Sequence, residues 1–175
     1  MKRTILLYFF LFLVRLSVAQ NDSSFNKKFS PELINFFANK QVEIDTTLPA
    51  ALYQVSYDWM GTRYCYSGHS EKGIDCSGFT KVIYSKAFSD TLSGGSADIA
   101  SKVQLVPQSE LKVGDMVFFR IKRKRVSHVG VYLGNNKFVH AAIKGGVQVN
   151  DLSEPYYKRY FYKGGRSEKR LSIQP

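Results

Sequence analysis

The first half of the chain has the hydrophobic period of α-helices. Apolar residues recur there every three or four positions, so that they line one face of each predicted helix. The first expected helix begins at Ser30-Pro31, with Leu33, Phe36 and Phe37 on one face. The second runs from about Pro49 to Met60, with Leu48, Leu52, Val55 and Trp59 at helical spacing. The third begins at Cys76, with Phe79, Val82, Ile83 and Ala87 buried and Lys81 and Lys86 facing water. Pro31 and Gly61 support these boundaries, because proline is favoured in the first turn of a helix and glycine just after the last.

Beyond Ser93-Gly94-Gly95-Ser96 the period shortens to that of β-strands. Successive strands are expected over Met116–Ile121, Val126–Leu133, Lys137–Ala142, Val147–Val149 and Tyr156–Tyr162. Asn135-Asn136 and Gly145-Gly146 have the composition of tight turns, which join antiparallel strands. This order along the chain, with the helices first and an antiparallel sheet after them, predicts an α+β domain. A length of 175 residues suits one such domain.

Residues 1–19 have the pattern of a cleaved export signal. Lys2-Arg3 forms a positive start, Ile5–Val14 is an apolar run, and Ser17-Val18-Ala19 offers small residues to a signal peptidase. The apolar run is short for an anchor that crosses a bilayer, and no cysteine follows it directly to accept a lipid. A retained N-terminal anchor is the alternative, and Arg15 fits a signal less well than an apolar residue would. We therefore expect an exported protein, either periplasmic or secreted.

The chain that remains after cleavage is strongly basic. The whole sequence carries 25 Lys and Arg against 14 Asp and Glu, a net charge of +11. Because 3 of the basic residues lie in the signal, cleavage leaves 22 basic and 14 acidic residues, a net charge of +8. A basic exported protein meets anionic cell-wall polymers or lipid headgroups, so nucleic acid is not the expected partner. The run Lys122-Arg123-Lys124-Arg125 is expected to be a solvated hairpin tip, with a dedicated binding site as the alternative.

One cysteine and two histidines form the strongest chemical pattern in the sequence. Cys76 begins a predicted helix directly after Asp75, while His128 and His140 each lie on a predicted strand. The free amide groups and the positive dipole end of a helix start stabilise a thiolate, so we expect a lowered pKa for Cys76. A thiolate, a histidine base and a group that orients the base are the components of nucleophilic amide hydrolysis.

Two structural roles compete for the same side chains. Cys65 lies in the extended apolar stretch Tyr64-Cys65-Tyr66, where a small buried side chain is expected, and it could form a disulfide with Cys76. Cys65, Cys76, His128 and His140 could also hold zinc, but structural zinc normally uses closely spaced ligand pairs that this sequence lacks. No metal or organic cofactor is expected for a cysteine hydrolase.

Five short motifs occur in order along the chain. They are Gly61-Thr62-Arg63-Tyr64, Asp75-Cys76-Ser77-Gly78, the segment from Leu111 to Phe119, the segment from His128 to Gly134, and Val139-His140-Ala141. Together they resemble the NlpC family of bacterial cell-wall cysteine peptidases over about residues 48–166. The resemblance implies a single papain-like domain, in which the catalytic cysteine begins a helix packed on an antiparallel sheet. Residues 20–47 then form a lead with a short helix, and residues 167–175 a C-terminal tail.

The resemblance also implies the roles of individual residues. Cys76 matches the nucleophile, His128 the general base, and His140 the residue that orients the base; Tyr64 matches a tyrosine near the oxyanion hole, and Asp75 and Ser77 match residues that shape the pocket and meet the substrate's free amine. Simpler roles stay open for three of these residues: packing for Tyr64, a hydrogen-bonded core position for His140, and helix capping for Ser77.

The function that this resemblance implies is hydrolysis of peptidoglycan stem peptides through an acyl-enzyme on Cys76. The bond usually cut in the family joins D-γ-glutamate to a diamino acid. The expected partners are stem peptides, with no nucleic acid and no stable membrane insertion after signal cleavage. Two alternatives stay open: a thiol-dependent amidase or acyltransferase that acts on a non-wall substrate, and a non-catalytic wall-binding module. Gly94-Gly95-Ser96 stands where an Arg-Thr-Ser-like segment often contacts substrate, which leaves the details of recognition open.

Overall fold

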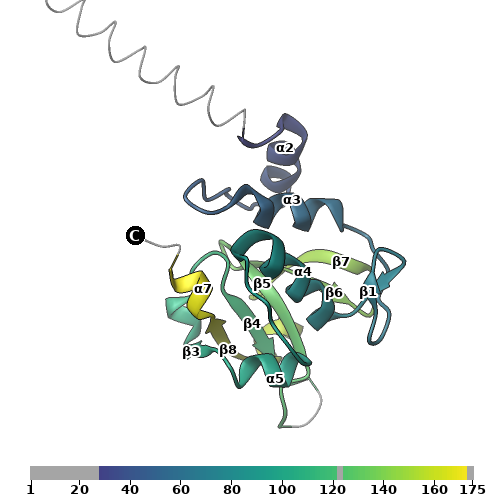
Figure 1. Cartoon of the computed structure of the whole chain (residues 1–175), viewed down its shortest axis with the longest axis vertical. Helices are drawn as coiled ribbons and strands as arrows, with labels where there is room; N and C mark the ends of the chain where they lie inside the picture. Colours follow the sequence, from purple (N-terminus) through teal and green to yellow (C-terminus); the bar gives the residue numbers. More distant parts are fainter. Residues whose placement is uncertain (1–27, 122–123, 173–175) are drawn as a thin grey trace, which may run out of the picture.

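The structure is a computed structural model that describes residues 28–121 and 124–172 (Figure 1). The predicted export signal, together with Lys122 and Arg123 of the basic run, lies outside the described residues. Among the residues that are described, no helix has both the length and the apolar character needed to cross a bilayer.

Six antiparallel strands form the main sheet, in the order β3-β8-β4-β5-β6-β7. Their bounds are β3 (Gln104–Val106), β4 (Met116–Phe119), β5 (His128–Gly134), β6 (Lys137–Ala142), β7 (Gly146–Asp151) and β8 (Phe161–Arg166). Asn135 and Asn136 join β5 to β6 with φ angles of 48° and 60°, a conformation that asparagine tolerates well in tight turns. The predicted hairpins of β5, β6 and β7 are confirmed.

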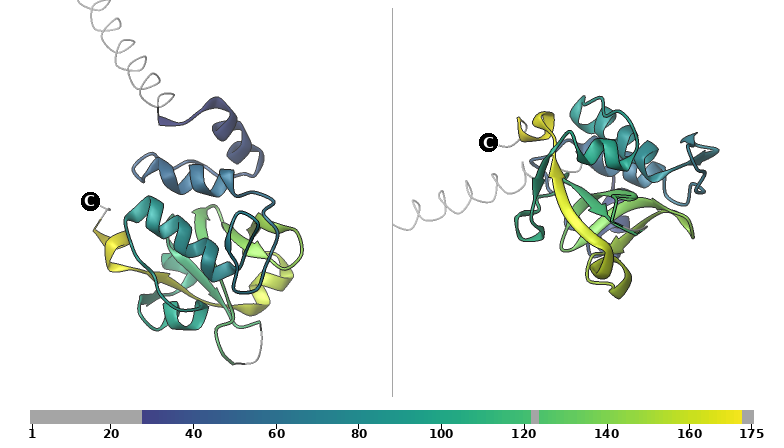
Figure 2. Two further views of the ribbon diagram at one scale, coloured as in Figure 1. Left: turned by 45° about the vertical axis from the view of Figure 1, so that its right-hand side comes forward. Right: turned by 90° about the horizontal axis from the view of Figure 1, so that it is seen from below.

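Three helices lie in a layer on one side of this sheet (Figures 1 and 2). They are α2 (Pro31–Asn39), α3 (Ala50–Asp58) and α4 (Cys76–Phe88). Helix α3 contacts α2 and α4, and α4 in turn contacts β5 and β6. The start of α2 is capped as the sequence predicts, because the Ser30 hydroxyl accepts a hydrogen bond from the Leu33 N–H at 3.2 Å. The α+β class is confirmed.

The last predicted strand is wrong over most of its length. Residues Pro155–Tyr160 form helix α6, and strand β8 begins only at Phe161. Pro155 lies in the first turn of α6, where proline is favoured, and Tyr157 is buried in an apolar cluster. The tyrosines that indicated a strand lie on a helix here. The preference of aromatic residues for strands comes from how their side chains pack and not from an intrinsic preference of their backbone, so it does not exclude a helix.

Several short elements were not predicted from the sequence. They are the hairpin β1 (His69–Ser70) and β2 (Gly73–Ile74), helix α5 (Ser96–Ala100), strand β3, the 3₁₀ turn Gln108–Glu110 and helix α7 (Glu168–Leu171). Each is too short for its hydrophobic period to be read from the sequence. Helix α7 lies in the predicted tail, where it buries the side chain of Arg170.

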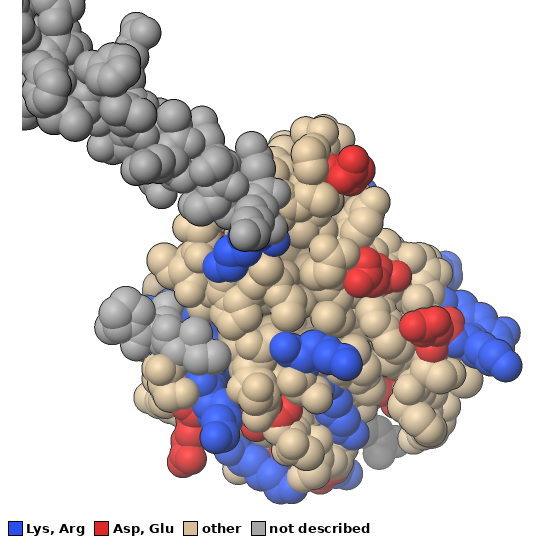
Figure 3. Space-filling view, turned by 45° about the horizontal axis from the view of Figure 1, so that its top comes forward, with Lys and Arg blue, Asp and Glu red and all other residues tan. Residues whose placement is uncertain are grey.

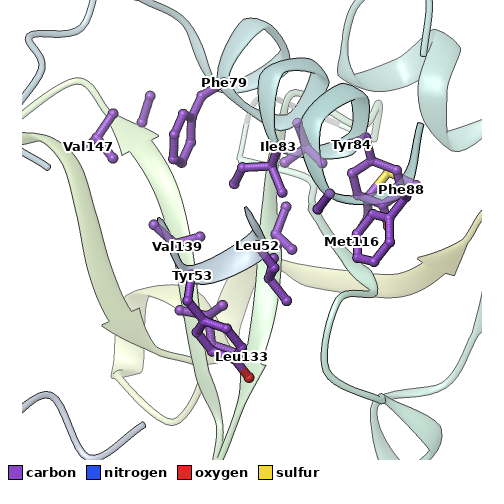
Figure 4. Packing of buried hydrophobic residues seen from close by; sticks show 14 of the residues in the cluster. Leu52, Tyr53, Phe79, Ile83, Tyr84, Phe88, Met116, Leu133, Val139 and Val147 are labelled. Carbon is purple, nitrogen blue, oxygen red and sulfur yellow. The ribbon is translucent and has the colours of Figure 1, made fainter. Parts of the chain in front are cut away.

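The pleat of the sheet divides its side chains between two apolar clusters. The larger cluster joins the sheet to the helices and includes Phe79 and Ile83 of α4 with Val139 of β6 (Figure 4). The smaller cluster includes Phe138 of β6 and Tyr157 of α6, whose ring centroids lie 4.9 Å apart. Phe138 and Val139 are consecutive residues in different clusters, because neighbouring side chains of a strand point to opposite faces.

A buried ion pair joins the residue before β4 to the last residue of the neighbouring strand β8. The Asp115 carboxylate is fully buried and accepts two hydrogen bonds from the Arg166 guanidinium, at 2.8 and 2.6 Å. It also accepts the Lys112 N–H at 2.8 Å, while Arg166 donates to the Glu110 carbonyl at 2.9 Å. Because both charges are paired and hydrogen-bonded, removing one partner would leave the other unpaired in the interior.

We therefore expect Asp115→Ala to lower the free energy of unfolding by roughly 3–5 kcal/mol, since it strands the Arg166 charge. Lys137→Ala is the matched control, because it breaks the partly exposed Lys137–Asp151 pair and should cost about 1 kcal/mol or less. Urea unfolding followed by the fluorescence of Trp59, the single tryptophan, measures both. Equal losses in the two variants would contradict a central role for the buried pair.

Candidate active site

Helix α4 presents Cys76 at its first position, and Asp75 is the residue that caps it. Asp75 Oδ1 accepts the Gly78 N–H at 2.6 Å and the Ser77 hydroxyl at 2.8 Å. Asp75 Oδ2 accepts the Ser67 N–H at 3.0 Å, which fastens the preceding loop to the helix start. The capping role considered for Ser77 is wrong, because Asp75 is the cap and Ser77 donates to it. Both Asp75 oxygens are thus engaged within the protein.

The loop before α4 approaches the helix so closely that Gly78 is required there. A Cβ atom on Gly78 would lie 2.6 Å from the Gly68 carbonyl oxygen, which is too short for a real contact. The Asp75 N–H donates to that same carbonyl at 3.1 Å. The glycine of the Asp75-Cys76-Ser77-Gly78 motif therefore lets the loop lie against the first turn of the helix.

The Cys76 thiol is buried beside the start of strand β5, with only 7% of the residue exposed. Burial raises the pKa of the Cys76 thiol to about 11, and a hydrogen bond from the backbone N–H of Val129 opposes that rise. The lowered pKa expected from the helix start is therefore wrong for this structure, because loss of hydration outweighs the dipole. In the resting protein Cys76 is a neutral thiol at physiological pH.

The two predicted histidines are in direct contact. His128 is the first residue of β5, His140 lies on β6, and His128 Nε2 is 2.6 Å from His140 Nδ1. Val131 pairs with Val139, so the next pair along the two strands is Gly130 opposite His140. Because Gly130 has no side chain, the His140 ring can extend over it to reach His128. A Cβ on Gly130 would lie 3.0 Å from the His140 Cβ.

Burial also keeps both imidazoles neutral. It lowers the pKa of His128 well below its usual value, and the neighbouring His140 lowers it further. Burial lowers the pKa of His140 to about 4, although Asn150 and Glu154 act in the opposite direction. The predicted nucleophile, Cys76, and its predicted base, His128, are thus both uncharged in the resting site.

The structure adds three polar residues on the far side of His140 that the sequence analysis missed. Asn150 Oδ1 lies 2.9 Å from His140 Nε2, and the Tyr157 hydroxyl lies 3.2 Å from the same nitrogen. Glu154 accepts both an Asn150 amide hydrogen at 3.0 Å and the Asp151 N–H at 2.8 Å. The predicted Gly145-Gly146 turn and strand alternation together could have placed Asn150 on the face of His140, but the predicted strand ended at residue 149.

An open groove of about 910 Å³ runs past Cys76. Its lining includes Tyr64, His69, Asp75, Cys76, Ser77, Lys81, Val82, Lys86, the segment Gly94–Asp98 and Arg125. Val82 and Lys81, which the sequence placed in the core and in solvent, are both half-buried in the groove wall. Burial raises the pKa of Tyr64 to about 12, so its hydroxyl stays protonated and can donate a hydrogen bond. Cys65 is absent from this lining.

Cys65 does not occupy the buried position that the sequence predicted. It is exposed, and both it and Cys76 are free thiols. The neighbouring Tyr66 is 85% exposed, so the expected apolar stretch is a surface loop. Across residues 28–121 and 124–172, no group of three or more His, Cys, Asp or Glu side chains is arranged to hold a metal ion.

Positive charge is distributed over the surface as well as in the groove. Figure 3 shows lysine and arginine side chains spread over one face of the molecule, with acidic side chains interspersed. In the groove, Lys81, Lys86 and Arg125 form no ion pair with any residue that the structure describes. The groove acids Asp75 and Asp98 accept hydrogen bonds from backbone amides at 2.6 and 2.9 Å.

Comparisons with known proteins agree with this arrangement. The sequence profile of the NlpC/P60 family matches residues 61–166, and the chain belongs to that family. The chain is 40% identical over 116 residues to a probable endopeptidase NlpC homolog of Haemophilus influenzae, which covers 66% of this chain and 61% of the relative. It is 38% identical over 109 residues to the murein DD-endopeptidase MepS/murein LD-carboxypeptidase of Escherichia coli K12, covering 62% of this chain and 57% of the relative.

A solved structure of an NlpC/P60 family protein from Bacillus cereus ATCC 10987 has the same fold. It superposes with a TM-score of 0.62 at 29% identity and covers 68% of this chain and 40% of that protein. The chain therefore spans about three fifths of the length of the first two relatives and less of this structure. The papain-like α+β fold expected from the motifs is consistent with these neighbours.

The neutral thiol can be tested by alkylation. In a Cys65→Ser variant Cys76 is the single remaining thiol, because the chain has 2 cysteines. With a pKa near 11, its reaction with iodoacetamide should be slow at neutral pH and rise about tenfold per pH unit toward pH 11. A Cys76→Ser variant, which keeps the exposed Cys65, gives the reference rate of a solvated thiol. A fast, pH-independent rate at neutral pH would show a preformed thiolate instead.

Proposed function

We propose that the protein is a cysteine endopeptidase that hydrolyses peptidoglycan stem peptides. The observation that carries this proposal is a cysteine at a helix start on an open groove, next to a strand that begins with one of two paired histidines, in a chain of the NlpC/P60 family. The Haemophilus influenzae relative is named a probable endopeptidase, which supports the reaction, and the Escherichia coli relative is named a murein endopeptidase, which supports the substrate class.

The reaction begins with a neutral Cys76 thiol and a neutral His128 imidazole. His128 Nε2 faces His140, so His128 Nδ1 is the nitrogen that takes the Cys76 proton as the sulfur attacks the amide carbon. The developing oxyanion is stabilised by the Cys76 backbone N–H at the helix start and by the Tyr64 hydroxyl. Protonated His128 then donates to the leaving amine as the carbon–nitrogen bond breaks, and water activated by His128 hydrolyses the acyl-enzyme.

The scissile bond in this proposal joins D-γ-glutamate to the diamino acid of the stem. The γ-linkage leaves the glutamate α-carboxylate free, so the substrate is anionic next to the bond that is cut. Lys81, Lys86 and Arg125 in the groove wall match that charge, and none of them forms an ion pair with a residue that the structure describes. A second candidate is the cross-link between stems, which the name of the Escherichia coli relative favours.

The cell-wall substrate requires the protein to leave the cytoplasm, and we include export in the proposal. The charged start, apolar run and small residues of positions 1–19 support it. The net charge of +8 after cleavage favours retention near anionic wall polymers.

Replacing the nucleophile tests the reaction. Cys76→Ala should reduce cleavage of purified muropeptides by roughly 10⁴-fold or more, because no other group can form the acyl-enzyme. Cys65→Ala is the matched control and should keep full activity, since Cys65 lies outside the groove lining. Cleavage by Cys76→Ala at the wild-type rate would end the proposal.

Mass spectrometry of the products from the same digests distinguishes the candidate functions. Cleavage at D-γ-glutamate releases a disaccharide dipeptide from an uncross-linked stem, whereas cleavage of cross-links converts dimers to monomers. Binding of muropeptides without any product would favour a wall-binding module, and inertness toward all wall fragments would favour an amidase or acyltransferase with another substrate.

The groove cations should contribute to substrate binding rather than to chemistry. Arg125→Gln and Lys81→Gln are each expected to raise KM about two- to fivefold with little change in kcat, as exposed charge pairs usually do. Replacing the stem's glutamate α-carboxylate by an amide should raise the KM of the wild-type enzyme by a similar factor. With this amidated substrate, the variants should have the same KM as the wild type. Lys163→Gln, an exposed lysine on β8 outside the groove, is the control. Unchanged KM in both groove variants would contradict this role.

A further inference from the structure

A histidine that acts as a base must carry its single proton on the correct nitrogen. In the proposed mechanism His128 takes the Cys76 proton on Nδ1, so this nitrogen needs a lone pair and the ring must carry its hydrogen on Nε2. The contact between His128 Nε2 and His140 Nδ1 is compatible with either direction of the hydrogen bond. Something beyond the two rings must therefore determine which nitrogen carries the proton.

We propose that Glu154 and Asn150 are positioning residues that determine the tautomer of both histidines. The proposal rests on the proposed function for its consequences in catalysis. The arrangement itself is a continuous chain of hydrogen bonds from a carboxylate to the ring of His128, and each step fixes the direction of the next.

The chain starts at Glu154, the residue that precedes helix α6. Its carboxylate has no hydrogen to donate, so it can only accept hydrogen bonds. It accepts the Asp151 N–H at 2.8 Å, which holds it beside the end of β7, and it accepts from the Asn150 amide at 3.0 and 3.3 Å. The amide nitrogen of Asn150 must therefore face Glu154, and its carbonyl oxygen must face the other way.

The Asn150 oxygen then acts on His140. Asn150 Oδ1 lies 2.9 Å from His140 Nε2 and, as an acceptor, requires a hydrogen on that nitrogen. The Tyr157 hydroxyl donates to the same oxygen at 3.3 Å, which leaves its own oxygen free to accept from His140 Nε2 at 3.2 Å. Both neighbours of His140 Nε2 thus favour a protonated Nε2.

The last step passes from His140 to His128. A neutral imidazole has one hydrogen, so a protonated Nε2 leaves His140 Nδ1 as an acceptor. At 2.6 Å from that acceptor, His128 Nε2 must be the donor, which leaves the lone pair of His128 on Nδ1. Were the Asn150 amide reversed, each bond would reverse, and His128 Nδ1 would carry a hydrogen and could not accept the thiol proton.

The chain of hydrogen bonds from Glu154 through Asn150 and His140 to His128, called the relay below, lies on the face of the sheet that α6 covers. His140 pairs with Gln148 and Phe138 pairs with Asn150 across β6 and β7, so His140 and Asn150 share one face. The charged pair Lys137–Asp151 flanks Glu154 along β6 and β7. The two residues Leu152 and Ser153, between the end of β7 and Glu154, bring the carboxylate back over the strand, which explains why its partners are so close in sequence.

The relay predicts different results for two similar variants. Glu154→Gln keeps the shape but can donate, so the Asn150 amide is free to reverse, and kcat should fall roughly ten- to hundredfold with KM changed less than about twofold. Adding Asn150→Asp to Glu154→Gln should restore most of the activity, because residue 150 is then acceptor-only and the new glutamine donates to it. Glu43→Gln, at an exposed site, is the matched control for the substitution.

Nitrogen NMR of ¹⁵N-histidine in the full chain reads the tautomers without any substrate. His69→Gln identifies the third histidine of the sequence, so the remaining signals belong to His128 and His140. The wild type should show protonated Nε2 and unprotonated Nδ1 in both rings, Glu154→Gln a mixture, and the double variant the wild-type pattern. A protonated His128 Nδ1 in the wild type, or no change of tautomer in Glu154→Gln, would overturn the relay.

The two proposals fail separately in these experiments. A wild-type protein that cuts no stem peptide would end the proposed function, while the NMR tautomers would still decide the relay. Thermal melting of each variant excludes unfolding as the cause of a lost signal, and Asn150→Leu, which removes both the acceptor and the donor, provides a second variant if Glu154→Gln is unstable.

Discussion

The 2.6 Å contact between His128 and His140 is the interaction on which the geometry of the site depends. It exists because strands β5 and β6 pair in a register that puts Gly130, which has no side chain, opposite His140. A side chain at Gly130 would meet the backbone and side chains of β6 at 3.0 Å or less. The orientation of the proposed base therefore follows from strand pairing, which is rigid, rather than from a loop.

Burial gives this pair its electrostatic character. The thiol and both imidazoles are removed from water, which disfavours their charged forms and shifts their pKa values apart, upward for Cys76 and downward for the histidines. The resting site therefore holds neutral groups, and in the proposed mechanism the separation of charge develops only as the sulfur attacks an amide carbonyl. A neutral resting thiol is also a poorer target for adventitious oxidation and alkylation than a thiolate.

Local signals in the sequence were sufficient for most of the elements that position the site. The start of α2 after its cap Ser30, the start of α4 at Cys76 and the bounds of β6 follow from caps, periodicity and turns, each of which acts over a few residues. The α6 helix, the exposed loop around Cys65 and the neutral thiol could not be predicted in this way. They depend on what packs against each segment, and on how much water remains there, which only the assembled fold determines.

The two faces of the sheet explain why both chemical groups begin their elements. Helix α4 packs on one face through Phe79 and Ile83, whereas His128 and His140 lie on the opposite face with α6. A cysteine in the middle of α4 would be separated from the histidines by the sheet itself. At the first residue of α4, Cys76 instead lies beside the start of strand β5, where it interacts with the Val129 backbone next to His128.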